Sequence, residues 1–359
     1  MGAVRPRPSP ASLLAWALLL ALVGGVSTAL ALVGFPSPLL FGGLLGALVF
    51  ALSSPRQVEM PPPAFTVGQA IIGVTVGAAL DWDTLIDLGD RWPAVIVISI
   101  VTMLLSVVVG QLLRLHRGVS AVTASFASAA GGASGMTAVA NDLGADDRVV
   151  TVIQYLRVLV VLLAMPAAVA LVFHADTDRG ASAAQASGDV GTGIAYAVVA
   201  IPLGIAVGRA LRLPSPAVLG ALVSSALLAL LPVFDGVVVP SWVQGLGFLL
   251  IGVQVGLRFT LESLKAIGRM LPTALLVIVL VIAICAGFGV LLAHLTGVSQ
   301  LDAYLATTPG GFYAVLATSA DTGGNLTFVT AVQVIRLLLV LLAAPLLGRW
   351  LAGRAGRGR

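Results

Sequence analysis

Apolar runs long enough to cross a membrane recur along the whole chain, and this recurrence limits its fold more than any other feature. A helix needs about 17 to 25 apolar residues to cross roughly 30 Å of hydrocarbon. Since 59% of the residues are apolar and only 9% are charged, the polar side chains are too few for a soluble protein of ordinary composition. The sequence therefore predicts an all-α polytopic membrane protein whose main partner is the lipid bilayer.

Ten of these runs lie between charged or Pro/Gly-rich breaks, and we expect each to be a transmembrane helix. They cover residues 12–33, 38–53, 64–80, 93–113 and 149–173 in the first half, and 191–208, 216–233, 241–257, 270–293 and 327–348 in the second. A weaker segment in each half, 119–141 and 302–320, is rich in Ala, Ser, Thr and Gly. The first run follows a basic start like a signal peptide, but about 22 residues are too many for a signal core, so we interpret it as a membrane helix.

The second half of the chain repeats the first. QYLRVLVVLLAMP (154–166) and QVIRLLLVLLAAP (333–345) lie 179 residues apart and share eight of thirteen residues. Gly73 and Gly77 recur as Gly252 and Gly256 at the same spacing, and the Pro-Ser-Pro of 36–38 recurs at 214–216. This duplication predicts repeat 1 (12–173), a polar linker (174–190) and repeat 2 (191–350), with cytoplasmic tails at 1–11 and 351–359.

Loop charges predict how the repeats lie in the membrane. The loop at 81–91 contains four aspartates and Arg91, whereas its equivalent contains Arg258, Glu262, Lys265 and Arg269. Positively charged loops face the cytoplasm, so equivalent loops lie on opposite sides and the repeats are inverted. The arginines before the first run and after the last one place both termini in the cytoplasm.

Inverted repeats need an odd number of crossings each. The five clear helices of a repeat meet this need if the weaker segment enters and leaves on the same side. A full crossing would give six helices and parallel repeats, which fits the loop charges less well. We therefore expect about ten transmembrane helices plus two Gly-Gly re-entrant or broken helices.

Two glycine breaks in the weaker segments are candidate binding elements. They read GGASG (131–135) and PGGFY (309–313). Non-helical backbone at membrane depth must be buried in protein or line a cavity, and helix N-termini there attract anions. The candidate residues are Gly131, Gly132, Ser134, Gly310 and Gly311. The alternative is that these small residues only pack helices closely.

Arg157 and Arg336 each lie about nine residues inside an apolar helix, roughly 13 Å deep at 1.5 Å per residue. A charge at that depth cannot face lipid. Together with Gln154 and Gln333, three residues earlier on the same helix faces, the arginines could bind a carboxylate or phosphate of a solute. Alternatively, they hold the free carbonyls of the broken segments or pair with aspartates.

Asp142 and Asp321 follow the two breaks by about ten residues. They could carry a coupling proton or sodium ion. The other interpretation is that they cap helices at the membrane interface.

Several function classes find no support in the sequence. The only cysteine, Cys285, lies in an apolar run, and the three histidines are far apart, so we expect no metal site and no cofactor. The chain contains no nucleophile–base pair or phosphate loop that would indicate an enzyme. We expect no direct contact with nucleic acid, because no soluble segment is longer than about 20 residues.

The regions GGASGMTAVANDLGADDRVVTVIQYLRVLVVLLAMP and TTPGGFYAVLATSADTGGNLTFVTAVQVIRLLLVLLAAP resemble the bacterial membrane-protein family called AbrB. The resemblance covers residues 12–350 and implies a duplicated membrane domain in the bacterial cytoplasmic (inner) membrane. It also implies a distant relation to cation:proton antiporters and anion transporters, among which the 2-hydroxycarboxylate transporters have similar Gly-Gly motifs at re-entrant tips. Gly131, Gly132, Gly310 and Gly311 match those motifs, although the second tip reads PGGFY.

Members of that family are labelled regulators of gene expression or ammonia monooxygenases. A copper monooxygenase would need clustered histidines and a transcription factor would need a soluble reading segment, and the sequence has neither. The sequence therefore predicts a multi-pass transporter of a small anionic solute, working by alternating access at a midplane site. The alternative is a non-transporting membrane regulator that affects gene expression indirectly. A homodimer is compatible with either function.

Overall fold

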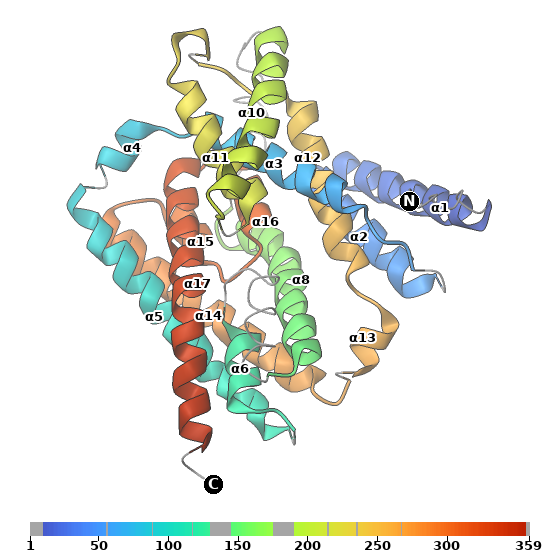
Figure 1. The fold of residues 1–359 in the computed structure, drawn as a ribbon, viewed down its shortest axis with the longest axis vertical. Helices are drawn as coiled ribbons and strands as arrows, with labels where there is room; N and C mark the ends of the chain where they lie inside the picture. The colour runs from blue at the N-terminus through green and yellow to red at the C-terminus, as the bar shows by residue number, and fades with distance from the viewer. Residues whose placement is uncertain are drawn as a thin grey trace.

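A computed structural model of the protein describes residues 10–54, 57–87, 89–116, 118–129, 145–174, 190–213, 215–234, 236–266 and 268–356. Every regular element in these residues is helical (Figure 1), so the predicted all-α fold is confirmed for this part of the chain. Five helices are long and apolar enough to cross a membrane. They are α1 (Pro10–Leu32), α5 (Trp92–Gly110, continued by a 3-10 turn to Leu115), α8 (Asp147–Leu171), α10 (Val190–Ala210) and α14 (Leu271–Thr296).

Five further apolar helices are shorter. They are α2 (Pro38–Ser53), α3 (Pro62–Ala78), α11 (Pro216–Ala229), α12 (Ser241–Leu257) and the Leu326–Val340 part of α17 (Leu326–Gly356). Each lies within a few residues of a run that the sequence predicts as a helix. At 14 to 17 residues they are below the roughly 20 residues of a typical transmembrane helix. The total of ten crossings therefore stays a prediction.

The ends of several helices differ from the predicted ranges for local reasons. α14 continues to Thr296 and stops where Gly297 takes a left-handed conformation, with φ at 72°. α11 ends at Ala229, and the last residues of the predicted run form the 3-10 turn Pro232–Phe234. Two short helices, α4 (Trp82–Asp87) and α13 (Leu261–Ala266), occupy equivalent loops of the two halves, where the sequence predicts only charged loops.

The helices form two bundles, and each bundle contains helices from both halves of the chain. In the first bundle, α2 packs on α12 and α3 on α11, with α1 against α2 and α10 against α11. The second bundle contains α5, α6 (Ala121–Ser128), α8, α14, α15 (Gln300–Thr307), α16 (Phe312–Asp321) and α17. Figure 1 shows the two bundles side by side, with α1 at the edge of the first and the C-terminus at the end of α17.

Equivalent glycines bring the halves together in the first bundle. A Cβ on Gly252 would lie 2.2 Å from the Leu40 carbonyl oxygen, and one on Gly73 would lie 2.4 Å from the Val218 carbonyl oxygen. Leu40 and Val218 are themselves equivalent positions of the repeat. Small residues of this kind let membrane helices approach closely. The contact between Gly252 and Leu40 is therefore repeated at the equivalent positions Gly73 and Val218.

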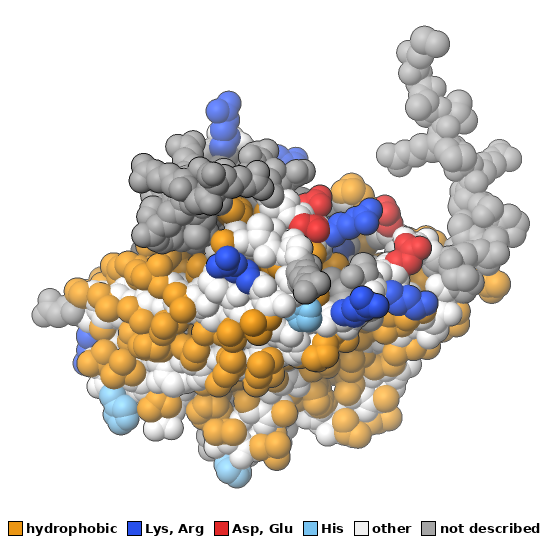
Figure 2. Space-filling model, turned by 90° about the horizontal axis from the view of Figure 1, so that it is seen from below, with side chains coloured by type: hydrophobic (Ala, Val, Ile, Leu, Met, Phe, Trp, Pro, Cys, Tyr) orange, Lys and Arg blue, Asp and Glu red, His pale blue; other side chains and the backbone are white. Residues whose placement is uncertain are grey.

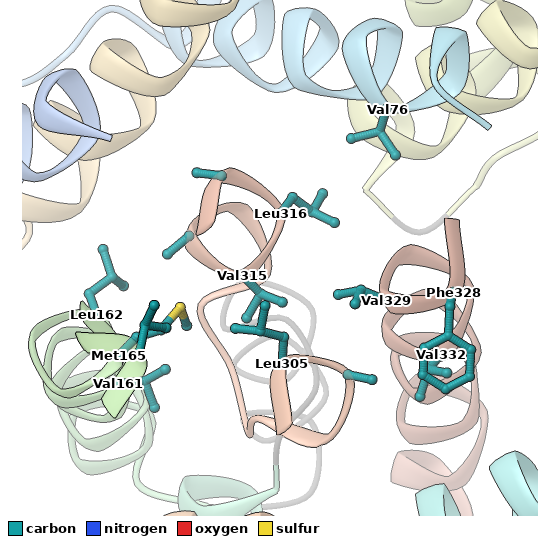
Figure 3. Close-up of a cluster of buried hydrophobic side chains, with 14 of the residues drawn as sticks. Val76, Val161, Leu162, Met165, Leu305, Val315, Leu316, Phe328, Val329 and Val332 are labelled. Atoms are coloured by element: carbon teal, nitrogen blue, oxygen red, sulfur yellow. The ribbon is translucent and has the colours of Figure 1, made fainter. Parts of the chain in front are cut away.

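The second weak segment of the sequence is a broken helix. α15 ends at Thr307, the chain turns at 308–311, and α16 starts at Phe312. Figure 3 shows its apolar side chains, among them Leu305 and Val315, between those of α8 and α17, with Val76 of α3 opposite Leu316. This packing places the glycine turn inside the protein.

The outer surface of the long helices is apolar. Large hydrophobic side chains on α5, α10 and α14 are exposed, including Leu104, Val198 and Leu276. Figure 2 shows hydrophobic side chains over much of the lower part of one face, with most of the charged side chains above them. An exposed apolar surface of this extent fits contact with lipid rather than water.

Candidate anion-binding site

The side chains of Gln154 and Arg157 hold the end of α6. Gln154 Nε2 donates hydrogen bonds to the carbonyl oxygens of Phe126 (2.7 Å) and Ala129 (3.0 Å). Arg157 Nη1 donates to the carbonyl oxygen of Ser128 (3.0 Å), and its Nη2 donates to Gln154 Oε1 (2.7 Å). The Gln154 side chain is fully buried, and only 3% of the Arg157 surface is exposed.

Gln333 and Arg336 hold the end of α15 in the same way. Gln333 Nε2 donates to the carbonyl oxygens of Leu305 (2.8 Å) and Thr308 (3.3 Å). Arg336 Nη1 donates to the carbonyl oxygen of Thr307 (2.9 Å), and its Nη2 donates to Gln333 Oε1 (2.8 Å). Each atom pair lies 179 residues after its counterpart in the first half.

These hydrogen bonds have a physical reason. The last carbonyl groups of a helix have no intrahelical donor and carry the negative end of the helix dipole. α6 and α15 end inside the protein, where water is not available to satisfy them. A buried guanidinium stabilised by a glutamine supplies both the donors and the positive charge. The Nη1 atoms of both arginines therefore bind carbonyl groups at the ends of α6 and α15, as the second interpretation of these arginines predicts.

The Nε atom of Arg157 is different. It is buried and has no hydrogen-bond partner among the described residues. It lies against the turn between α15 and α16, because a Cβ on Gly310 would be 3.2 Å from it. Gly310 has φ at +105°, a conformation that side-chain-bearing residues rarely adopt. Glycine at this position therefore brings the backbone of one half against the arginine of the other.

A cavity of about 210 Å³ lies at this contact, between the two bundles. It is lined by Arg157 and Arg336, by Gly310 and Gly311, and by apolar side chains such as Val158 and Phe312. α3 and α12 of the first bundle close it from the opposite side through residues that include Phe65 and Val255. At roughly 30 Å³ per water molecule, the volume equals that of about seven waters. A small organic acid or an inorganic oxyanion has this size.

The charge of the cavity favours an anion. Both guanidinium groups line it, and no carboxylate pairs with either of them in the part of the chain that the structure describes. The N-terminus of α16, with Gly311 as its N-cap, also lies at the cavity. Helix N-termini carry unpaired N–H groups and a partial positive charge. A carboxylate or oxyanion could accept hydrogen bonds from Arg157 Nε and from these backbone groups together.

Asp321 does not pair with either arginine. It is the last residue of α16 and accepts a hydrogen bond from the Ser37 hydroxyl, at the start of α2 in the first bundle. The cap at the start of α17 comes from Asn325, whose Oδ1 accepts from the Phe328 N–H at 2.9 Å. Asp321 therefore does not cap α17, the helix that follows it; its carboxylate lies at the start of α2, where it accepts from the hydroxyl and the backbone N–H of the N-cap residue Ser37 and links the two bundles.

Several predicted residues lie outside the described part of the chain. These are Gly131, Gly132, Ser134 and Asp142. The structure brings together Gln154, Arg157, Gln333, Arg336, Gly310 and Gly311, and it leaves Asp321 at a separate contact.

Other residues line the cavity that the sequence did not predict as binding residues, although Arg258 counts among the charges of the basic loop. Gln69 Nε2 donates to the Tyr313 hydroxyl at 2.7 Å, which joins α3 to α16 across the cavity. Tyr155 and Arg258 also line it, and the Arg258 guanidinium carbon lies 5.6 Å from the centre of the Tyr155 ring. The sequence repeat does not mark these residues, because their counterparts are chemically different; Ala79, for example, stands where the second half has Arg258.

Comparison with known proteins agrees with the resemblance seen in the sequence. A family described as "Transition state regulatory protein AbrB" matches residues 39–352. The chain is 31% identical to "Putative regulator AbrB" of Escherichia coli (strain K12), over 94% of this chain and 97% of that protein. It is 28% identical to "Uncharacterized protein YhjN" of Bacillus subtilis (strain 168), over 92% of this chain and 91% of that protein. With a family match over most of its length, the chain belongs to the AbrB family.

Proposed function

We propose that this protein transports a small organic or inorganic anion across the bacterial cytoplasmic membrane. The observation that carries the proposal is the buried Arg157 Nε without a partner among the described residues, next to Gly310 in a cavity between two bundles. A buried donor left without a partner costs about 1–3 kcal/mol, and a bound anion would remove this penalty. The apolar walls of the cavity favour a carboxylate with a short hydrocarbon part over a fully hydrated ion.

The proposal includes ten membrane crossings arranged as two inverted repeats. Its support is the matching hydrogen bonds of the halves and the direction of two equivalent helices. α8 starts beside α6, where the Asp146 N–H donates to Thr123 Oγ1 at 3.1 Å, at the lower end of the molecule in Figure 1. α17 ends at that lower end. Equivalent helices that run in opposite directions fit a two-fold axis in the membrane plane.

Alternating access would come from movement of one bundle against the other. Two equivalent contacts between the bundles differ, which supports this mechanism. At one, the Asp81 N–H donates to Thr327 Oγ1 at 3.0 Å, and the Thr327 hydroxyl donates to the Ala79 carbonyl at 3.4 Å. At the other, the equivalent residues Thr260 and Arg148 line a cavity of about 580 Å³. In this proposal the structure is closed toward the acidic loop at 81–91 and open toward the basic loop at 258–269.

Heat stability of the purified protein with candidate anions tests the binding step. The panel contains small mono- and dicarboxylates, amino acids, phosphate and sulfate, each compared with chloride at equal ionic strength. A ligand at 100 times its Kd raises the free energy of unfolding by about 2.7 kcal/mol. Failure of every anion to stabilise the protein would contradict the proposal.

Uptake of the stabilising anion into liposomes that contain the protein tests the transport step. The family description and the name of the Escherichia coli relative describe regulators, and a membrane regulator that binds an anion without moving it is the second candidate function. Stabilisation without uptake or exchange would favour this second function. Uptake or exchange of the anion would favour the transporter.

A further inference from the structure

We infer that Arg258 is the cationic side chain at the junction between the outer cavities and the central cavity, and that it makes this path selective for negative charge. The inference extends the proposed function and depends on it for the direction of the anion. It concerns a residue outside the Gln–Arg pairs that hold the broken helices.

Arg258 lies where three cavities adjoin. It lines the central cavity with Tyr155, a second cavity of about 430 Å³ with Glu59, and the third cavity of about 580 Å³ with Arg148. Every other charged residue of the two outer cavities, namely Glu59, Asp147, Arg148 and Glu262, is absent from the lining of the central one. Arg258 is therefore the charged side chain that the two outer cavities share with the central one, at the places where a solute would pass between them.

Two neighbours hold the Arg258 side chain at this junction. Its guanidinium carbon lies 5.6 Å from the centre of the Tyr155 ring, a distance at which a cation and a ring attract each other. The Gln254 amide, turned so that its oxygen faces the guanidinium, accepts hydrogen bonds from Arg258 Nη2 (3.0 Å) and Nε (3.1 Å). Tyr155 belongs to α8 of the second bundle and Gln254 to α12 of the first. The charge is thus held between the bundles, although the side chain is exposed.

The equivalent place in the other half has the opposite character. Ala79 replaces Arg258, and the nearby Asp81 carboxylate accepts a hydrogen bond from the Thr84 hydroxyl, which lowers the pKa of that carboxyl. This side of the protein therefore has a negative charge where the other has a positive one. A charged opening changes the local concentration and the arrival rate of charged solutes, by roughly tenfold to a thousandfold.

Cysteine modification measures this selectivity without any knowledge of the solute. Cys285 is replaced by serine in the full-length protein, and one cysteine is placed in the central cavity, as Val158→Cys or as its repeat equivalent Leu337→Cys. Membrane vesicles of both orientations are treated with an anionic sulfonatoethyl methanethiosulfonate or a cationic trimethylammonium-ethyl methanethiosulfonate. We expect both cysteines to react from the side of Arg258, with a higher rate for the anionic reagent.

Substitutions at Arg258 then test its role. Arg258→Gln is expected to lower the ratio of anionic to cationic rates by roughly tenfold, and Arg258→Lys is expected to keep it. Arg269→Gln is the matched control, because this arginine lies in the same loop but lines none of the three cavities. A ratio that Arg258→Gln leaves unchanged, an equal effect of Arg269→Gln, or cysteines that react only from the other side would each overturn the inference. Failure of the proposed transport would appear separately, as the absence of anion stabilisation and uptake.

Discussion

Arg157 of the first half lies against Gly310 of the second, so that a Cβ on Gly310 would be 3.2 Å from Arg157 Nε. The two Nη atoms of the same guanidinium are occupied by Ser128 and Gln154. One side chain therefore holds the end of α6 in its own half and turns toward the other half an Nε atom that has no hydrogen-bond partner among the described residues. The sequence left two roles open for this arginine, and its three nitrogens accommodate both.

Gly310→Ala is expected to weaken anion binding without disturbing the hydrogen bonds of the Nη atoms. The new methyl group would fill the space next to Arg157 Nε, and its positive φ would cost about 1–3 kcal/mol. The measurement is the heat stability of the protein with and without the anion that stabilises the natural protein. Gly287→Ala is the control, because a Cβ there meets nothing within 4 Å. If Gly310→Ala kept the full stabilisation by the anion, the anion would not bind at this turn.

Gln154→Ala and Gln333→Ala are expected to destabilise the protein to a similar degree. Each removes the donor to two buried carbonyl groups and the acceptor for an arginine Nη2, and each buried group left without a partner costs about 1–3 kcal/mol. The midpoint of thermal unfolding in detergent measures the effect. Gln300→Ala, at an exposed glutamine in the first turn of α15, is expected to change stability by less than about 0.5 kcal/mol. A large effect at only one of the two positions would contradict the equivalence of the two pairs.

Two cysteine pairs are expected to report the open and closed contacts between the bundles. In a protein with Cys285→Ser, the pair Asp81→Cys and Thr327→Cys is expected to form a disulfide under mild oxidation, because these residues are in contact. The equivalent pair Arg148→Cys and Thr260→Cys is expected to react with a soluble maleimide, because both residues line a cavity.

If the bundles move, the disulfide at 81 and 327 stops anion flux, and reduction restores it. Flux that continues at the same rate with this disulfide in place would contradict alternating access by movement of the bundles.

Asp321→Asn is expected to keep both the stability of the protein and its stabilisation by the anion. Asn retains a side-chain oxygen that can accept the hydrogen bond from the Ser37 hydroxyl, and Asp321 contacts neither arginine. Ser37→Ala removes the donor and is expected to lower the unfolding temperature. Loss of anion stabilisation in Asp321→Asn would instead place its charge at the binding site.

Much of the helical framework can be predicted from the sequence, because lipid imposes a length and an apolar composition on each spanning helix. Residues 38–53 and 241–257 are helices with the predicted bounds, and other helices differ by a few residues at their ends. The two glycine breaks also follow from the sequence, and the second one is a broken helix at 308–311. The number of crossings is less certain from length alone, since α11 has only 14 residues.

The candidate site could be predicted only in part. The repeat identifies Gln154, Arg157, Gln333 and Arg336. A charge inside an apolar helix costs free energy, and the same Gln and Arg residues occur at equivalent positions of both halves. The repeat does not identify Tyr155, which lies on α8 between Gln154 and Arg157, or Gln69 and Arg258, which reach the cavity from parts of the chain far away in the sequence; none of the three has equivalent chemistry in the other half.

The sequence by itself determined that this chain is duplicated, that it forms apolar helices, and that an arginine lies within the equivalent apolar run of each half. These properties follow from local composition and from self-comparison, which need no knowledge of contacts. Only the tertiary structure decided which atoms each arginine contacts. The partners of Arg157 are a backbone carbonyl at the end of α6 and the backbone at Gly310, and backbone groups are the same at every position of the sequence. The contact of Arg157 Nη1 with the end of α6 and the position of its Nε next to Gly310 are therefore properties of the packing of the helices against each other.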